Sequence, residues 1–280
     1  MEKINITHKT RIVLCILFLS QTIFGFSKGN YFFPGIGFKD VPLIELKKDS
    51  TLEIVKTLKE YKRIFGLTGI FDTVNHFYSS DIDNDDTNEL IYFGLTSAEG
   101  YWTIIWKTEG QSYRLLGELY GKINGIGDSF HLSTLAPACC GSDCGYANLY
   151  RIADDWIDLL RSVAIFKGVT LPDSPPIREK IIINDTGRSL RTQPIINDKP
   201  GGMKTQRYGV LRGNAIVELD KGVSASATAR FKDRTGRVWL FLVLDNPPNA
   251  DYNVYKAYKK ENRRICGWIS ALDLIYREIH

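Results

Sequence analysis

The chain has 280 residues, of which 44% are hydrophobic and 24% are charged, and its formal net charge is +4. This composition is ordinary for a globular protein, and the length is enough for two modest domains that each bury a core. After residue 27, no stretch approaches the eighteen or more consecutive apolar residues of a membrane-spanning helix, so a transmembrane segment is not expected there.

The N-terminus has the pattern of a signal peptide over residues 1–27. Basic residues precede an apolar run over 12–19 that is too short to span a bilayer, and Gly25 and Ser27 offer a cleavage point between small residues. We therefore expect a secreted or periplasmic protein with no transmembrane segment after signal removal and no nucleic-acid partner. The alternatives are an uncleaved anchor or a buried N-terminal helix.

An amphipathic helix is predicted over residues 51–63. Its apolar residues recur with the helical period, and Asp49 or Ser50 marks its start, with Glu53 in the capping-box position. We expect this helix to cover a small β-sheet assembly.

An acidic loop follows over residues 81–89, with oxygen-bearing residues at alternate positions. Ca²⁺ takes six to eight oxygen ligands, and a tight loop turns alternate side chains inward. Crowded carboxylates without a counterion would also repel one another. Calcium is therefore the expected cofactor, and a degenerate, metal-free turn is the alternative. The predicted ligands are the carboxylates of Asp81, Asp83, Asp85 and Glu89 and the backbone carbonyl of Thr87.

This loop resembles the Asp-rich loop that precedes strands in FG-GAP and VCBS-type β-repeats. An EF-hand fits less well, because this chain has Asp86 where the sixth position needs Gly and Tyr92 where the twelfth needs an acid. Asp tolerates the left-handed conformation better than most residues. The resemblance implies that residues 90–93 form the following strand.

Strand patterns after the loop recur at an offset of 44 residues. A hairpin is predicted over 101–116, and a second one over 144–160 aligns with it without a gap. We interpret this as an internal repeat of a β-meander within a domain over residues 28–171. The second copy keeps only Asp128 of the acidic loop, so no second ion is expected.

Four cysteines remain after the leader. In an oxidising compartment, an even count favours disulfides, and a bridge from Cys140, or from Cys139, to Cys144 would staple the second hairpin. The alternatives are a thiolate metal site or a nucleophile, but no His lies at ligand spacing. Cys266 is expected to be a buried apolar residue.

A linker is predicted over residues 172–178, where three prolines disfavour a helix or a central strand. The net charge also changes sign there. Residues 28–176 hold 14 Lys and Arg against 20 Asp and Glu, whereas residues 177–280 hold 19 against 11. The resulting charges are −6 and +8, so the basic half either attracts an anionic polymer or is a solvated face that docks on the acidic half.

The C-terminal region has four landmarks in order, namely GRSLRTQP over 187–194, GVLRG over 209–213, VWLFLV over 238–243 and CGWI over 266–269. In order and rough spacing they resemble bacterial SH3-like domains. The resemblance implies a small β-barrel over residues 179–280 that binds peptidoglycan or another cell-surface ligand. Extra residues over 222–236 and a long polar stretch over 245–264 depart from the pattern.

The expected fold is therefore mainly β, with a β-meander repeat domain and one packed helix followed by an SH3-like barrel. We expect Arg191 and Tyr208 near the ligand and Trp239 and Trp268 as pillars of that site, with plain core packing as the alternative. The sequence has no nucleophile elbow and no zinc-binding helix, so we predict no enzymatic activity. The expected function is an exported, non-catalytic protein that binds a cell-wall glycan or peptide. A protein-protein adaptor bound to an envelope protein, and a cell-wall hydrolase or its accessory, are the alternatives.

Overall fold

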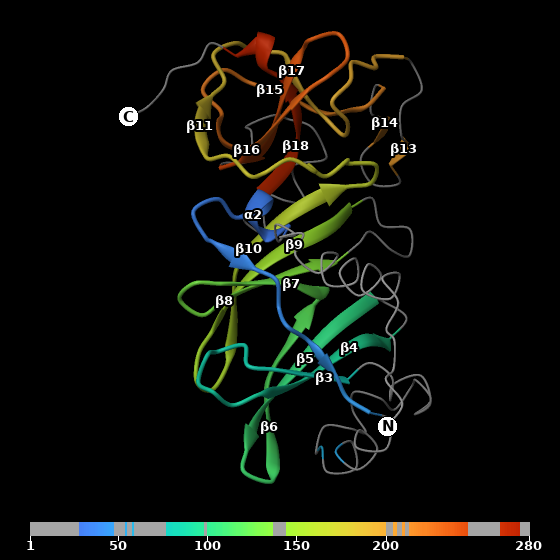
Figure 1. The fold of residues 1–280 in the computed structure, drawn as a ribbon. Coiled ribbons are helices and arrows are strands. Elements are labelled where there is room, and N and C mark those ends of the chain that lie inside the picture. Colours follow the sequence, from blue (N-terminus) through green and yellow to red (C-terminus); the bar gives the residue numbers. More distant parts are fainter. Residues whose placement is uncertain are drawn as a thin grey trace, which may run out of the picture.

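The computed structural model describes residues 28–47, 77–97, 100–136, 144–199, 204–205, 209–210, 213–245 and 264–274, together with Ile54 and Leu58. Within them the protein is mainly β, as predicted, with one short α-helix, α2 (Gly29–Phe32), and one 3-10 turn, η2 (Ala271–Asp273) (Figure 1). No described helix has the length and apolar character needed to cross a membrane. The predicted signal peptide lies outside the described residues.

A five-stranded antiparallel sheet carries the acidic loop. Its strands follow chain order, namely β2 (Ile44–Glu45), β3 (Phe77–Ser80), β4 (Glu89–Ser97), β5 (Gly100–Glu109) and β6 (Ser112–Tyr120). Successive side chains of a strand face opposite sides of the sheet. Leu90 accordingly packs on the outer face beside Leu58 and Ile54, the two described residues of the predicted helix, whereas Ile91 packs on the inner face.

The second meander packs against this inner face. Its strands are β7 (Lys122–Gly127), β8 (His131–Ala136), β9 (Cys144–Ile152) and β10 (Ile157–Phe166), with β1 (Phe38–Lys39) paired to β7. Both predicted hairpins are present, as β5-β6 and β9-β10. The β3-β4 and β7-β8 turns also correspond, because Asp86 and Phe130, 44 residues apart, have φ of 65° and 61°.

Six strands of the C-terminal region enclose one hydrophobic cluster. They are β11 (Glu179–Ile182), β12 (Arg188–Arg191), β15 (Ala215–Leu219), β16 (Ser224–Lys232), β17 (Val238–Leu244) and β18 (Arg264–Ser270), while β13 (Lys204–Thr205) and β14 (Gly209–Val210) form a separate pair. Each of the six contributes to the cluster, for example through Ile181, Leu190, Leu219, Ala225, Leu242 and Ile269. The SH3-like identity of this region stays a prediction.

Gly267 allows β12 and β18 to approach closely at the centre of this region. A Cβ atom added there would lie 2.8 Å from the Arg191 carbonyl oxygen and 2.9 Å from the Leu190 side chain. Any larger residue would therefore push these two strands apart.

The two halves of the chain are joined through a continuous sheet. Strand β10 pairs in parallel with β18, where Val163 is opposite Arg264 and Ala164 is opposite Ile265. The resulting eleven-stranded sheet continues from β7–β10 in the middle of the molecule into the C-terminal strands above them (Figure 1). This pairing satisfies a strand edge of β10 that would otherwise be open.

A hydrophobic cluster, which we call the shared core, lies at this joint. It combines residues of the N-terminal half with residues of the C-terminal half, namely Tyr31, Phe32, Phe33, Phe38, Ala147, Leu149 and Val163 with Ala229, Trp239, Phe241, Val243, Cys266 and Trp268. The predicted linker is also held, because the Ile177 amide donates to the Thr228 carbonyl at 2.9 Å and the Ser174 hydroxyl donates to the Arg230 carbonyl at 3.2 Å. The sequence predicted a separate core for each half. Within the described residues the C-terminal half has none of its own, because Cys144, Ala164 and Phe166 of the N-terminal half also belong to the cluster that the six C-terminal strands enclose.

Candidate metal centre

The acidic loop (residues 81–89) is shaped by its own carboxylates. The two Asp81 oxygens accept the backbone N–H groups of Asp85 at 3.2 Å and of Asp86 at 3.1 Å. Asp85 in turn accepts the Thr87 N–H at 2.8 Å. Asn84 and Asp86 have φ of 58° and 65°, which confirms the left-handed conformation predicted for Asp86. Asn and Asp adopt this conformation more readily than most residues, so the sequence suits the turn.

Three of the five predicted ligands meet in this loop. Asp81, Asp83 and Glu89 each offer a carboxylate oxygen, and these oxygens lie within 4.8 Å of one another. The group lies below the surface, because Asp83 is 8% exposed and Glu89 is fully buried. The loop begins at the end of β3 and Glu89 begins β4, so a β-hairpin fixes both sides of the group.

Two oxygens of this group are buried without a hydrogen-bond partner, namely Asp83 Oδ1 and Glu89 Oε1. The second Glu89 oxygen, Oε2, accepts the Ile82 N–H at 3.0 Å. Burying a carboxylate oxygen without a partner costs several kcal/mol when the group is ionised, and such atoms are rare in native proteins. A cation between these oxygens would remove that cost.

The electrostatics of the loop also show an excess of negative charge. The pKa of Glu89 is raised to about 7, mainly by burial and also by the charges of Asp83, Asp85 and Asp81, while the hydrogen bond from the Ile82 N–H acts in the lowering direction. A carboxyl group with this pKa is half ionised near neutral pH. The loop therefore has one acid that the protein alone does not stabilise in its charged form.

Lys107 on β5 supplies the one positive charge that contacts the loop within the described residues. Its ammonium lies 2.9 Å from Asp83 Oδ2 and 3.1 Å from Asp85 Oδ2. The hydrogen bond from Lys107 lowers the pKa of Asp85, and the bonds to Asp83 and Asp85 raise the pKa of Lys107. Lys107 occupies Oδ2 of Asp83 and leaves Oδ1 available.

Of the two remaining predicted ligands, Asp85 lies outside the three-carboxylate group, and the role of the Thr87 carbonyl stays a prediction. Both Asp85 oxygens are engaged, one by Lys107 and one by the Thr87 N–H. Asp85 is therefore a counterion of Lys107 in this structure and not a member of the three-carboxylate group. Lys107 was not among the predicted site residues, and its place beside the loop follows from the pairing of Leu90 with Trp106, the residue before it on β5.

A cleft of about 500 Å³ opens next to the acidic loop. Its walls come from the loop, from the segment after β1 and from the β7-β8 turn, and its ionisable residues are Lys39, Asp40, Asp81, Asp83 and Asp128. The meander repeat thus brings the one acid retained by the second copy, Asp128, beside the loop of the first copy. The cleft adds carboxylates to the side of the loop that faces solvent.

The predicted ligand-binding residues of the C-terminal half are buried. Trp239 and Trp268 are 1% and 2% exposed, and their indole N–H groups donate to the Asp233 carboxylate at 2.9 Å and to the Thr170 carbonyl at 2.7 Å. Both belong to the shared core, so plain core packing accounts for them and a surface ligand cannot reach them.

Arg191 is also committed to internal contacts. It is 8% exposed, and its guanidinium donates to Asn214 Oδ1 at 2.8 Å and pairs with Asp198 at 2.8 Å. These contacts hold the segment after β12, and little of the side chain is exposed to a ligand. Tyr208 lies outside the described residues, so its role stays a prediction.

The predicted disulfide stays a prediction, because Cys139 and Cys140 lie outside the described residues. Cys144 is buried, and its thiol donates to the Tyr146 hydroxyl at 3.4 Å. Cys266 is fully buried in the shared core, and burial raises its thiol pKa, which confirms the apolar role predicted for it.

Comparisons with protein-family models, curated proteins and solved structures found no match for this chain.

Proposed function

We propose that this chain is an exported, non-catalytic binding protein whose acidic loop holds a structural Ca²⁺ ion. The observation that carries the proposal is the pair of buried, unpartnered oxygens, Asp83 Oδ1 and Glu89 Oε1, beside the Asp81 carboxylate. A divalent cation bound by these three residues would give both oxygens a partner and would thereby stabilise the loop.

The donor set fits a hard cation. All three ligands are carboxylates, and Ca²⁺ accepts irregular sets of carboxylate, carbonyl and water oxygens, whereas Mg²⁺ demands a near-ideal octahedron. Backbone carbonyls of the loop and water would complete the coordination. The ion would neutralise the carboxylates and fix the β3-β4 turn, which is a structural role.

Calcium binding is tested on the whole chain by following thermal unfolding with increasing Ca²⁺ after treatment with EDTA. Stabilisation should rise with the logarithm of the Ca²⁺ concentration above the dissociation constant. Asp83→Asn should lose this response, and Asp154→Asn, which changes an exposed acid outside the loop, should keep it. Equal melting temperatures of the wild-type protein in EDTA and in millimolar Ca²⁺ would remove the metal from the proposal.

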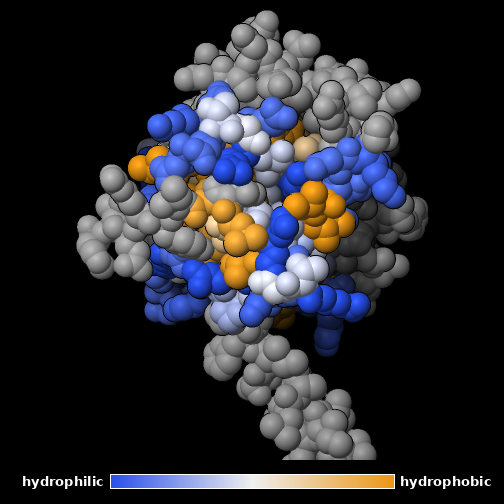
Figure 2. All heavy atoms as spheres, turned by 90° about the horizontal axis from the view of Figure 1, so that it is seen from above, coloured by the Kyte–Doolittle hydropathy of each residue, from blue (hydrophilic) through white to orange (hydrophobic). Residues whose placement is uncertain are grey.

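A second proposed activity is the binding of an envelope ligand by the C-terminal half. The observations that favour it are the charge of +8 over residues 177–280 and the order of the SH3-like landmarks. Because Arg191, Trp239 and Trp268 are buried, a ligand would contact the outer surface of this half. That surface carries hydrophilic side chains around separate small hydrophobic groups (Figure 2). Its charge suits an anionic glycan or peptide.

Sedimentation with purified peptidoglycan sacculi tests this second activity. The whole chain is required, because the shared core would be cut by expressing residues 177–280 alone. Retention in the pellet that weakens as salt is raised is the expected result for an anionic wall ligand. No retention favours a protein-protein adaptor, and release of soluble wall fragments would show an enzyme instead.

A further inference from the structure

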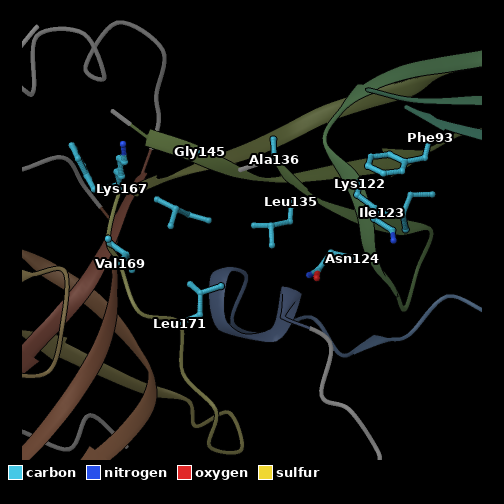
Figure 3. A pocket seen from close by; sticks show the side chains of 13 residues that line it. Phe93, Lys122, Ile123, Asn124, Leu135, Ala136, Gly145, Lys167, Val169 and Leu171 are labelled. Carbon is cyan, nitrogen blue, oxygen red and sulfur yellow. The ribbon is translucent and has the colours of Figure 1, made fainter. Parts of the chain in front are cut away.

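A cavity of about 660 Å³ lies beside the joint between the two halves of the molecule and shares no lining residue with the acidic cleft. Its walls come from β7, β8, the end of β10 and the segment that follows β10. Figure 3 shows Leu135 of β8 and Val169 and Leu171 of that segment around the same space. The cavity therefore lies where the two meanders meet the chain that leads to the C-terminal half.

The floor of this cavity is the open edge of the shared core. Leu135, Ile165, Val169 and Leu171 pack on the shared core but are only half-buried, and each lines the cavity. Half-buried aliphatic side chains gathered around one concave site favour burial by an apolar ligand. The volume falls in the usual range of sites that hold small organic ligands.

The charged groups of the cavity all have one sign. Among its lining residues the ionisable side chains are Lys122 and Lys167, and no carboxylate lines it. Both lysines are exposed, and neither forms an ion pair within the described part of the chain. The Lys122 ammonium lies 5.4 Å from the centre of the Phe93 ring. Figure 3 places Lys122 and Lys167 at opposite ends of the cavity.

We propose that this cavity binds an amphiphile with an acyl chain and an anionic headgroup. The aliphatic floor would bury the chain, and Lys122 or Lys167 at the rim would pair with the headgroup. These cations stand out because residues 28–176 carry a net charge of −6. The site is independent of the acidic loop, so binding does not require Ca²⁺.

Decanoate, decanol and decyltrimethylammonium serve as probes that share the chain and differ in the headgroup. In calorimetry on the whole chain in EDTA, decanoate should bind up to about fivefold more tightly than decanol, because an exposed ion pair is worth at most about that factor. The cationic probe should bind most weakly. Shortening decanoate to octanoate should weaken binding roughly tenfold, because each buried methylene contributes up to about fourfold.

Variants separate the two features of the site. The double variant Lys122→Gln and Lys167→Gln should bind decanoate no better than decanol, and the two single variants identify the end that holds the headgroup. Lys232→Gln, which removes an exposed lysine that does not line the cavity, should behave as wild type. Leu135→Trp should fill the cavity and abolish binding.

The outcomes decide the proposal directly. The melting temperature of Leu135→Trp shows whether that variant is folded, and Val169→Phe replaces it if it is not. Absence of saturable decanoate binding by the wild-type protein would overturn the proposal. Equal affinity for decanoate and decanol, or unchanged binding in a folded cavity-filling variant, would overturn it as well.

Discussion

Replacing Glu89 with Gln should make the metal-free protein more stable at pH 8 and remove its stabilisation by Ca²⁺. Glutamine keeps an oxygen that can accept the Ile82 N–H, so the backbone contact at 3.0 Å is preserved. It removes the buried negative charge beside Asp81 and Asp83. The two effects have opposite signs in EDTA and in Ca²⁺, and few other substitutions would reverse sign in this way.

The size of the effect follows from the pKa of Glu89. It is raised from 4.5 to about 7 by burial, and since one unit corresponds to about 1.4 kcal/mol, ionising Glu89 in the folded protein costs roughly 3 kcal/mol at most. The new amide N–H₂ group also needs partners, and leaving it without them costs about 1 to 2 kcal/mol. We therefore expect a net gain of about 1 to 2 kcal/mol at pH 8.

The pH dependence has a definite direction. A carboxyl with a raised folded pKa binds more protons in the folded state, so the metal-free wild-type protein is most stable below pH 4.5 with respect to this group. That stability is lost as the pH rises through about 7. Glu89→Gln should therefore be more stable than wild type at pH 8 and less stable than wild type at pH 4.5 and below, where only the amide penalty remains.

Urea unfolding in EDTA at both pH values measures the free energies, and the same titrations in Ca²⁺ give the second half of the test. The matched control is Asp154→Asn, whose side chain lies outside the loop. If Glu89→Gln is less stable than wild type at pH 8 in EDTA, the buried carboxylate is satisfied in a way that this account does not include.

Three further predictions concern other contacts. Lys107→Gln removes an ion pair and should lower the free energy of unfolding in EDTA by about 1 kcal/mol. It also removes a cation that competes with Ca²⁺, so Ca²⁺ binding measured by calorimetry should become stronger. Weaker Ca²⁺ binding would contradict this prediction. Gly267→Ala should destabilise by about 1 to 3 kcal/mol in urea, because its Cβ would lie 2.8 Å from the Arg191 carbonyl oxygen; a neutral effect would contradict the close approach. Thr235 and Trp239 lower the pKa of Asp233 to about 2, so this contribution to stability is present above pH 3.8 and is lost as pH falls toward 2. Asp233→Asn should flatten that acid-side fall in urea midpoints, and an unchanged fall would contradict this.

The meander repeat could be predicted from the sequence because neighbouring residues determine its strands and turns. Alternation of residues such as Leu90 and Ile91 between two faces fixes a strand, and the turn at Glu109–Gly110 fixes a hairpin. The acidic loop was readable for the same reason, since its carboxylates cap its own backbone. Local chemistry therefore predicted β4 after the acidic loop and the two hairpins, β5-β6 and β9-β10, whereas β7 and β8 were not predicted.

The joint between the halves could not be predicted from the sequence. Pairing of Val163 with Arg264 connects strands about a hundred residues apart, and nothing in either strand's pattern distinguishes a neighbouring strand from solvent or from a separate domain. The burial of Trp268 depends on the same joint, because its indole N–H reaches the Thr170 carbonyl across the halves. Aromatic residues of a buried strand and of a ligand site look alike in sequence, so only the fold distinguishes them.

Calorimetric titration of the EDTA-treated whole chain with Ca²⁺ at pH 8 tests the central claim most directly. The account predicts saturable binding of one ion per chain that is lost in Asp83→Asn and Glu89→Gln and kept in Asp154→Asn. Absence of saturable binding up to millimolar Ca²⁺, or equal binding by the loop variants and the wild-type protein, would contradict it.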